Sequence, residues 1–419
     1  MSIFIKNIKK LVNCREESPE LLRGAQLGEL PCIENAYLII DNEEIADMGE
    51  MSELLPDQLH AIESSVDKVI DATGRMVLPS YCDSHTHLVY AGSREMEFSD
   101  KLHGLSYQEI AARGGGILNS VELLHNTSEA LLLKQALERA DEIISFGTGA
   151  VEIKSGYGLT LEDEMKMLRV AARISSERPL TVKTTLLAAH AVPSRYKGNR
   201  EGYVDEIIRE IIPAVAAEGL AEYVDIFCEE GFFTVEDAER IFEAGAKYGL
   251  RPTVHANQMS VSGGVEVGIK HHAISVDHLE FTGQAQWRAL AESDTIATLL
   301  PGATFFLNMD YPDARAMIKE GVAIAIASNY NPGSCPAGDM KFMMALALLK
   351  MKITPEEAIN AATVNGAYAM GVEDIHGSIT PGKKASLFIT KEIPSYEFIP
   401  YSFTTPLVET VILKGKIYE

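Results

Sequence analysis

Short apolar runs alternate with longer amphipathic stretches from about residue 76 to about residue 370. The stretches 161–177 and 234–249 have a helical period, and the second begins at Thr234, a good N-cap residue, with Asp237 three positions later. Eight apolar runs can be distinguished, at residues 76–87, 150–155, 181–190, 223–229, 251–257, 273–280, 295–302 and 322–329.

Eight β–α alternations predict a (β/α)8 barrel of the TIM type, in which a ring of parallel strands is surrounded by helices. An open, doubly wound sheet is the alternative. No GxGxxG follows the first run, which disfavours the nucleotide-binding form of that alternative.

The two ends of the chain share a different pattern of short strands and turns. Examples are residues 36–50 near the start and residues 407–419 at the end. We therefore predict two domains: a small β-sandwich built from residues 1–75 and 380–419, and a barrel from residues 76–379.

Charge and cysteine content narrow the classes of partner. The formal net charge of −23 argues against nucleic acid and against an anionic membrane surface. The apolar runs are too short to cross a bilayer, and no signal peptide is indicated. The five cysteines are scattered without a CxxC pair, which favours a reducing, cytoplasmic location over a disulfide framework.

Polar residues follow most of the apolar runs, at the point where each predicted strand ends. In TIM barrels the catalytic groups lie at this end of the strands. The sequence therefore predicts one polar cluster at the C-terminal end of the barrel, drawn from His85, His87, Lys154 to Tyr157, His190, Glu229, His255, His278 and Asn329.

The histidines of this cluster suggest a binding site for a divalent metal ion. His85 and His87 are two residues apart, so on a strand both side chains point to the same face. An isolated HxH is more often two polar loop residues, but His255 and His278 at later strand ends favour a metal site. Imidazole ligands suit zinc or iron, and an open position would hold a water whose pKa falls to about 7.

Two further features suggest a substrate with a carboxylate. Arg94 follows the HxH closely, so it is expected in the loop over the site rather than as a surface charge. Its planar, always charged guanidinium is suited to binding a carboxylate. The residues 331–334, "NPGS", predict a turn that brings backbone amides near the end of the eighth strand. His190, after an apolar run, is predicted to lie in the pocket.

These motifs resemble the amidohydrolase superfamily and, within it, the imidazolonepropionase family. HxH alone is common to many hydrolases, whereas the combination of "KSGYGL", "AHAVP" and "NPGS" is specific. The matching stretches occur in family order between about residues 75 and 370: "DSHTHLVYAGSRE", "GGGI", "EIKSGYGLTLEDEMKMLR", "AAHAVP", "VDIFCEEGFF", "HANQMSVSGG", "DHLE", "LLPGA" and "NPGS".

The resemblance implies hydrolysis of the cyclic amide of 4-imidazolone-5-propanoate to N-formimino-L-glutamate, a step of histidine degradation, and a homodimer. It implies His85, His87 and His255 as metal ligands, with His278 near the metal. The positions it implies as substrate contacts are Arg94, Tyr157, His190, Gln258, Asn331, Gly333 and Ser334.

The chemistry of these residues fits that reaction. Arg94 could pair with the propanoate carboxylate, and a metal-bound hydroxide could attack the ring carbonyl. His278 or His190 could polarise the carbonyl or transfer protons, and the sequence does not decide between them.

One position departs from the family pattern. The resemblance implies an aspartate at the end of strand eight that binds the metal and accepts a proton, but this chain has Asn329. An asparagine oxygen could still contact the metal, whereas it cannot accept a proton as a carboxylate does. The substitution could be engineered, which the agreement elsewhere favours. It could also mark a natural relative of low activity or an enzyme with another base.

Three other functions remain open at this point. An aminohydrolase acting on a nucleobase-like ring would use similar ligands, although Arg94 argues for an acidic substrate. A ligand-binding relative without catalysis would explain Asn329. A barrel with purely structural histidines would bind no metal.

Overall fold

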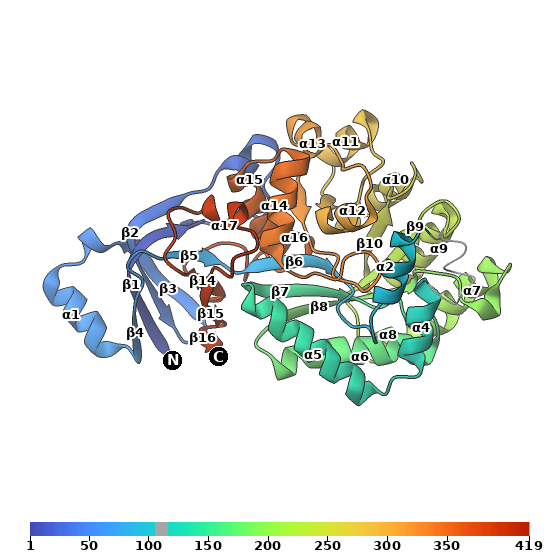
Figure 1. Cartoon of the computed structure of the whole chain (residues 1–419), viewed down its shortest axis with the longest axis horizontal. Helices are drawn as coiled ribbons and strands as arrows, with labels where there is room; N and C mark the ends of the chain where they lie inside the picture. The colour runs from blue at the N-terminus through green and yellow to red at the C-terminus, as the bar shows by residue number, and fades with distance from the viewer. Residues whose placement is uncertain (105–115, 419) are drawn as a thin grey trace.

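The computed structural model describes residues 1–104 and 116–418 and consists of a barrel beside a sheet made from both ends of the chain (Figure 1). Both chain ends lie at the terminal sheet, on the left in Figure 1. No helix in these described ranges is both long enough and apolar enough to cross a membrane.

The barrel is a ring of eight strands in chain order, each parallel to the next. It closes where the amide of Asn329 donates to the carbonyl of His85 (2.9 Å) and the amide of His87 donates to the carbonyl of Tyr330 (3.0 Å). The predicted (β/α)8 barrel is confirmed. Its strands are β6 (Tyr81–Thr86), β7 (Thr148–Lys154), β8 (Thr181–Ala189), β9 (Tyr223–Cys228), β10 (Arg251–Ala256), β11 (Ser275–His278), β12 (Ile296–Leu299) and β13 (Ile324–Ile326).

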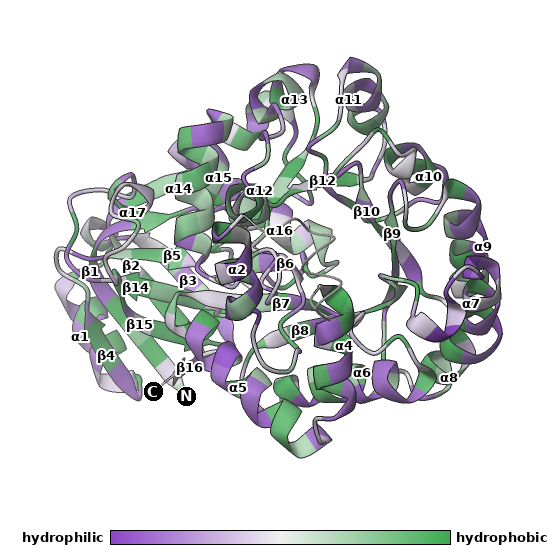
Figure 2. Cartoon of the chain, turned by 45° about the vertical axis from the view of Figure 1, so that its right-hand side comes forward, coloured by the Kyte–Doolittle hydropathy of each residue, from purple (hydrophilic) through white to green (hydrophobic). Residues whose placement is uncertain are grey.

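Helices cover the outside of the barrel, with apolar and polar residues alternating along them (Figure 2). The start of α9 matches the sequence prediction: Thr234 donates its amide to the Asp237 carboxylate (3.0 Å), and its hydroxyl accepts from the Asp237 amide (3.3 Å). The described helices between β6 and β14 are α2 (Glu95–Leu102), α4 (Ile117–His125), α5 (Glu129–Ser145), α6 (Leu161–Glu177), α7 (Arg200–Glu206), α8 (Ile212–Ala217), α9 (Val235–Ala246), α10 (Gly264–Lys270), α11 (Gln284–Ala291), α12 (Pro301–Leu307), α13 (Ala314–Glu320), α14 (Met340–Met351), α15 (Pro355–Ala362) and α16 (Val364–Ala369).

The terminal sheet joins strands from both ends of the chain in the order β16-β15-β14-β5-β1-β2-β3, with β4 also paired to β1. A separate apolar core, which includes Ile5, Leu38, Ile40 and Leu387, stabilises this unit. The strands are β1 (Ser2–Val12), β2 (Cys32–Asp41), β3 (Glu44–Glu50), β4 (Lys68–Asp71), β5 (Met76–Pro79), β14 (Leu387–Thr390), β15 (Val408–Leu413) and β16 (Lys416–Tyr418), accompanied by α1 (Pro56–Ser65) and α17 (Phe398–Tyr401).

The apolar run 76–87 is two strands rather than the single barrel strand expected from the sequence. β5 pairs with β1 and β14 of the terminal sheet, and the first barrel strand begins at Tyr81. The amide of Ser80 donates to the carbonyl of Ser386 in the terminal part of the chain (3.0 Å), whereas the amide of Tyr81 donates to the carbonyl of Gly147, the residue before β7 (2.9 Å). The chain therefore crosses between the two sheets at this point, and the domain division at residue 76 stays a proposal.

Candidate active site

Four histidines meet at the C-terminal ends of the barrel strands. The ring centroids of His85 and His255 are 4.5 Å apart, and those of His255 and His278 are 5.3 Å apart. The Nε2 atoms of His87 and His255 lie 3.4 Å apart. One nitrogen from each of His85, His255 and His278 lies within 4.8 Å of the others, so these imidazoles could share one ion.

His190 and Tyr157 extend the cluster from the ends of β8 and β7. The ring of His190 stacks on His87 with centroids 5.1 Å apart, and Tyr157 lies 5.5 Å from His190. His190 Nδ1 donates to the carbonyl of Gly156 (3.0 Å), which leaves Nε2 as the unprotonated nitrogen of the neutral ring. Burial lowers the pKa of His190 to about 3, so the ring is neutral at pH 7.

Two aspartates fix the orientation of two of these imidazoles. Asp277 lies 2.6 Å from Nδ1 of His85, and both carboxylate oxygens of Asp225 lie 3.2 Å from Nδ1 of His255. A carboxylate that accepts the Nδ1 proton leaves Nε2 available for a metal, which is the usual arrangement behind metal-binding histidines. Among described residues, His85 Nε2 is buried without a hydrogen-bond partner.

A buried lysine lies among these carboxylates inside the barrel. Lys154 Nζ is 2.8 Å from Asp225, 3.1 Å from Glu152 and 3.6 Å from Asp277. Burial disfavours its charge, but the three carboxylates more than compensate and raise the pKa of Lys154 above its usual value. Burial also disfavours the Asp225 carboxylate, yet Lys154 and His255 hold the pKa of Asp225 well below its usual range.

The turn after β13 contributes several polar groups. Asn331 Oδ1 accepts from the amides of Gly333 and Ser334, each at 2.8 Å, and its Nδ2 donates to the carbonyl of Asn329 (2.7 Å). Asn329 has a φ of 57°, a conformation that Asn adopts more readily than most residues. Its side-chain oxygen is buried without a hydrogen-bond partner among the described residues.

Arg94 lies beside this turn, immediately before α2. Its Nε and Nη2 donate to Glu97 Oε2 at 2.9 and 2.6 Å, so part of its charge is already paired. A Cβ added to Gly333 would lie 2.1 Å from Arg94 Nη1, which shows how closely the guanidinium approaches the turn backbone. The absence of a side chain at position 333 therefore makes room for Arg94.

One cavity of about 400 Å³ is lined by nearly all of the predicted metal ligands and substrate contacts. Of the predicted metal ligands and substrate contacts, only His85 does not line it; this side chain is fully buried, with its ring centroid 4.5 Å from that of His255. Apolar residues, among them Phe227 and Met309, complete the wall. The predicted residues that line the cavity are His87, Arg94, Tyr157, His190, Gln258, His255, His278, Asn329, Asn331, Gly333 and Ser334.

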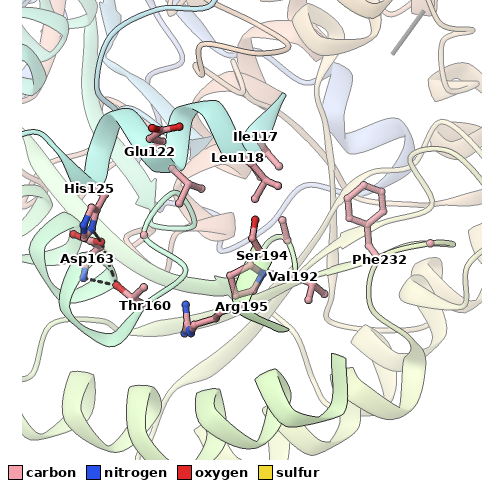
Figure 3. Close-up of a pocket in the computed structure, with 15 residues that line it drawn as sticks. Ile117, Leu118, Glu122, His125, Thr160, Asp163, Val192, Ser194, Arg195 and Phe232 are labelled. Atoms are coloured by element: carbon pink, nitrogen blue, oxygen red, sulfur yellow. Dashed lines mark hydrogen bonds and ion pairs between the residues drawn. The ribbon is translucent and has the colours of Figure 1, made fainter. Parts of the chain in front are cut away.

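A larger groove of about 920 Å³ adjoins this cavity and shares Ile117 and Phe232 with it (Figure 3). Its polar residues include the pair His125–Asp163, with Nδ1 and Oδ2 2.7 Å apart. The groove is the larger hollow, but the convergent imidazoles and the arginine line the smaller one. The chemistry therefore identifies the smaller cavity as the candidate site.

The donor set fits a divalent metal ion. Nitrogen ligands from several neutral, buried histidines are typical of zinc and iron sites. Burial, together with neighbouring charged groups, holds the pKa values of His85 and His87 well below the usual range, so both rings are neutral and able to bind a cation. Among the described residues, His85 Nε2 and Asn329 Oδ1 are two of the buried site atoms that lack a hydrogen-bond partner, and an ion would satisfy such groups.

A model of the amidohydrolase family matches residues 76–418 of the chain. The imidazolonepropionase of Flavobacterium johnsoniae is 51% identical over 417 residues, and that of Christiangramia forsetii is 49% identical, each match covering 100% of both chains. The imidazolonepropionase of Geobacillus kaustophilus is 41% identical, covering 99% of this chain and 97% of its own. The chain belongs to the imidazolonepropionase family of amidohydrolases.

Solved structures of other amidohydrolase-like enzymes share the fold. A zinc complex of atrazine chlorohydrolase from Arthrobacter aurescens superposes with a TM-score of 0.72 at 13% identity, covering 99% of this chain and 94% of that one. An adenosine deaminase from Xanthomonas campestris with bound zinc gives 0.68 at 15% identity, covering 99% and 92%. At these identities the likeness concerns the fold alone.

Several residues around the candidate site do not follow from the sequence pattern, namely Asp225, Asp277 and Glu280. The pattern places Lys154 in the polar cluster, whereas its ammonium lies among carboxyl groups inside the barrel. A charged residue inside an apolar strand run, such as Asp225 in "YVDIFC", is the signal that could have found them. In the glycine stretch "GGGI", Gly114 and Gly115 lie outside the described residues.

Proposed function

We propose that the protein hydrolyses the cyclic amide of 4-imidazolone-5-propanoate to N-formimino-L-glutamate in histidine degradation. The observation that carries this proposal is the convergence of the imidazoles, Arg94 and the 331–334 turn on one cavity of about 400 Å³. The name shared by relatives that are up to 51% identical over the full chain supports the same reaction.

We propose His85, His87 and His255 as ligands of one divalent ion, zinc or iron, with the Asn329 oxygen beside it. His278 is close enough to complete or replace this set, because its nitrogen lies within 4.8 Å of those of His85 and His255. When bound, such an ion lowers the pKa of a water to about 7 and polarises a carbonyl oxygen.

The substrate's carboxylate is assigned to Arg94. The guanidinium lies against the turn at Gly333, so a propanoate tail held there would place the ring towards the histidines. Tyr157, Gln258 and Ser334 line the same cavity and would contact the ring or the tail. These contacts would orient the cyclic amide for attack.

Proton transfer is assigned to His278 and His190. Burial keeps His190 neutral, and its Nδ1 is occupied by the Gly156 carbonyl, so Nε2 is the nitrogen that can accept a hydrogen bond or proton. His278 lines the opposite part of the cluster, next to His255. Both are within reach of a ligand that fills the cavity.

Asn329 limits the rate in this proposal because an amide cannot accept the proton of the attacking water. We therefore expect Asn329→Asp to raise kcat by roughly 10²- to 10⁴-fold, the usual contribution of a general base. The measurement is the decay of substrate absorbance with metal-loaded protein. Asn42→Asp is the matched control, because Asn42 also has a left-handed backbone (φ 56°) but lies in an exposed turn.

The outcomes separate the parts of the proposal. Turnover by the Asn329→Asp protein alone would support both the substrate and the role of position 329. Equal turnover by both proteins would leave the substrate assignment and overturn the role of position 329. If neither protein turns over while metal is bound, the substrate assignment is wrong and a nucleobase-like ring is tested next.

A homodimer and a cytoplasmic location complete the proposal. The scattered cysteines support a reducing compartment, and all five are free in the structure. Light scattering of the purified protein would measure the oligomeric state.

A further inference from the structure

The end of β11 has an unusual backbone. His278 and the next residue, Leu279, have φ values of 86° and 70°, a region that residues with a side chain seldom adopt. The conformation is held by hydrogen bonds from the Leu279 amide to Ala256 (3.1 Å) and from the Phe281 amide to Asn257 (2.8 Å). Such strain persists where the surrounding structure enforces it and is concentrated at functional sites.

This backbone brings the side chains of His278 and Glu280 together. His278 Nδ1 and Glu280 Oε2 lie 3.7 Å apart, and the two side chains are only 3% and 1% exposed. Both atoms are buried, and neither has a hydrogen-bond partner among the described residues. A buried carboxylate oxygen without a donor is costly, and the nearby Nδ1 is a group that can supply one.

Glu280 is held in place from its other side. Its Oε1 accepts a hydrogen bond from the hydroxyl of Thr304 in α12 (2.8 Å). The carboxylate is therefore fixed through one oxygen, while the second lies beside the imidazole. A shift of less than about 1 Å would bring Oε2 within hydrogen-bond distance of Nδ1.

We propose that Glu280 is a positioning residue that accepts the Nδ1 proton of His278 and so leaves Nε2 of that ring available to the cavity. The role of His278 in turnover rests on the proposed function, whereas the hydrogen bond itself does not. His278 and His190 then differ in their acceptors: a carboxylate holds the first ring, and the Gly156 carbonyl holds the second. A charged acceptor forms roughly twice as strong a bond, so His278 is the more firmly oriented ring.

The test compares zinc-loaded protein with its Glu280→Gln, Glu280→Ala and Thr304→Val variants. Glutamine has the same shape, but with its oxygen on the Thr304 hydroxyl it presents an NH₂ group to Nδ1. Histidine ring ¹⁵N–¹H NMR without substrate reports the protonated nitrogen. We expect a strongly hydrogen-bonded Nδ1–H on His278 in the parent protein, and its loss or transfer to Nε2 in Glu280→Gln.

Turnover is the second measurement. We expect kcat to fall about tenfold in Glu280→Gln and more in Glu280→Ala, with KM nearly unchanged, and a smaller fall in Thr304→Val. Glu357→Gln is the matched control, because Glu357 is also buried but pairs with Arg315 away from the cavity. Identical His278 ring signals in parent and Glu280→Gln proteins would overturn the proposal. The NMR result decides even if no variant turns over, and Thr304→Val tests the hydrogen bond if Glu280→Ala does not fold.

Discussion

At the scale of single residues, Arg94 is a proposed substrate contact that is already paired within the protein. Two of its nitrogens donate to Glu97, which itself accepts from Asn119 Nδ2 (3.2 Å). Burial disfavours the Glu97 carboxylate, but Arg94, together with hydrogen bonds from Asn119 and the Gly116 backbone, lowers the pKa of Glu97. The pair fixes the guanidinium plane beside Gly333, so a substrate carboxylate would meet a preorganised donor.

Arg94→Lys should therefore weaken substrate binding without removing the positive charge. An ammonium cannot form the paired, planar contacts of a guanidinium, and losing one charge-assisted hydrogen bond costs about 1.5–3 kcal/mol. We expect KM to rise about tenfold to a hundredfold while kcat changes little, measured by steady-state absorbance. Lys197→Arg, on the loop after β8, controls for general effects of exchanging these side chains. A fall in kcat at unchanged KM would contradict the carboxylate assignment.

At the scale of elements, the strand ends could be predicted because each polar residue follows an apolar run. The cap at Thr234 and the histidines after four strands follow from local pattern alone. The split of residues 76–87 could not be predicted, since Met76–Pro79 and Tyr81–Thr86 are both buried strands separated by one residue, and strands far away in the chain decide which sheet each one joins. The pairing of Asp277 with His85 depends on two strands that are 192 residues apart in the chain.

The contribution of Lys154 in β7 to stability can be seen only in the assembled barrel. Lys154 at its end is fully buried and lies among carboxylates from β7, β9 and β11. Removing the lysine would leave the buried Asp225 carboxylate without its nearest cation, and breaking a buried pair in this way costs about 3–5 kcal/mol.

We expect Lys154→Met to lower the free energy of unfolding of the metal-free protein by about that amount, measured with denaturant. Lys341→Met is the control: Lys341 is also mostly buried, but its Nζ donates to the carbonyl of Thr405 rather than to a carboxylate cluster. Equal losses of unfolding free energy in the two variants would show that the carboxylate cluster does not make Lys154 more important for stability than another buried lysine.

At the scale of the whole molecule, stability should depend on pH through buried groups outside the site. His376 is 3% exposed, and its Nε2 lies 2.9 Å from Thr181 Oγ1 at the start of β8. Burial, aided by Lys414 and Lys383, lowers the pKa of His376 to about 3, whereas an unfolded chain titrates near 6.5. The unfolded state therefore binds the proton first as the pH falls, and stability is lost from about pH 6.5 towards pH 3.

Other buried groups act in the opposite direction, so a single pH profile is ambiguous. Burial raises the pKa of Glu152 to about 8 and that of Asp83 to about 7, and each stabilises the fold less as the pH rises through these values.

The contribution of His376 can be isolated by comparing the unfolding free energies of the parent and a His376 variant, because the other groups contribute equally to both. His376→Gln keeps a polar side chain near Thr181 but cannot titrate. Between pH 7 and pH 5 the unfolding free energy of the parent should fall by about 2 kcal/mol more than that of His376→Gln, because the proton uptake at this histidine is missing from the variant. Parallel curves from denaturant unfolding at several pH values would show that His376 titrates normally in the folded protein.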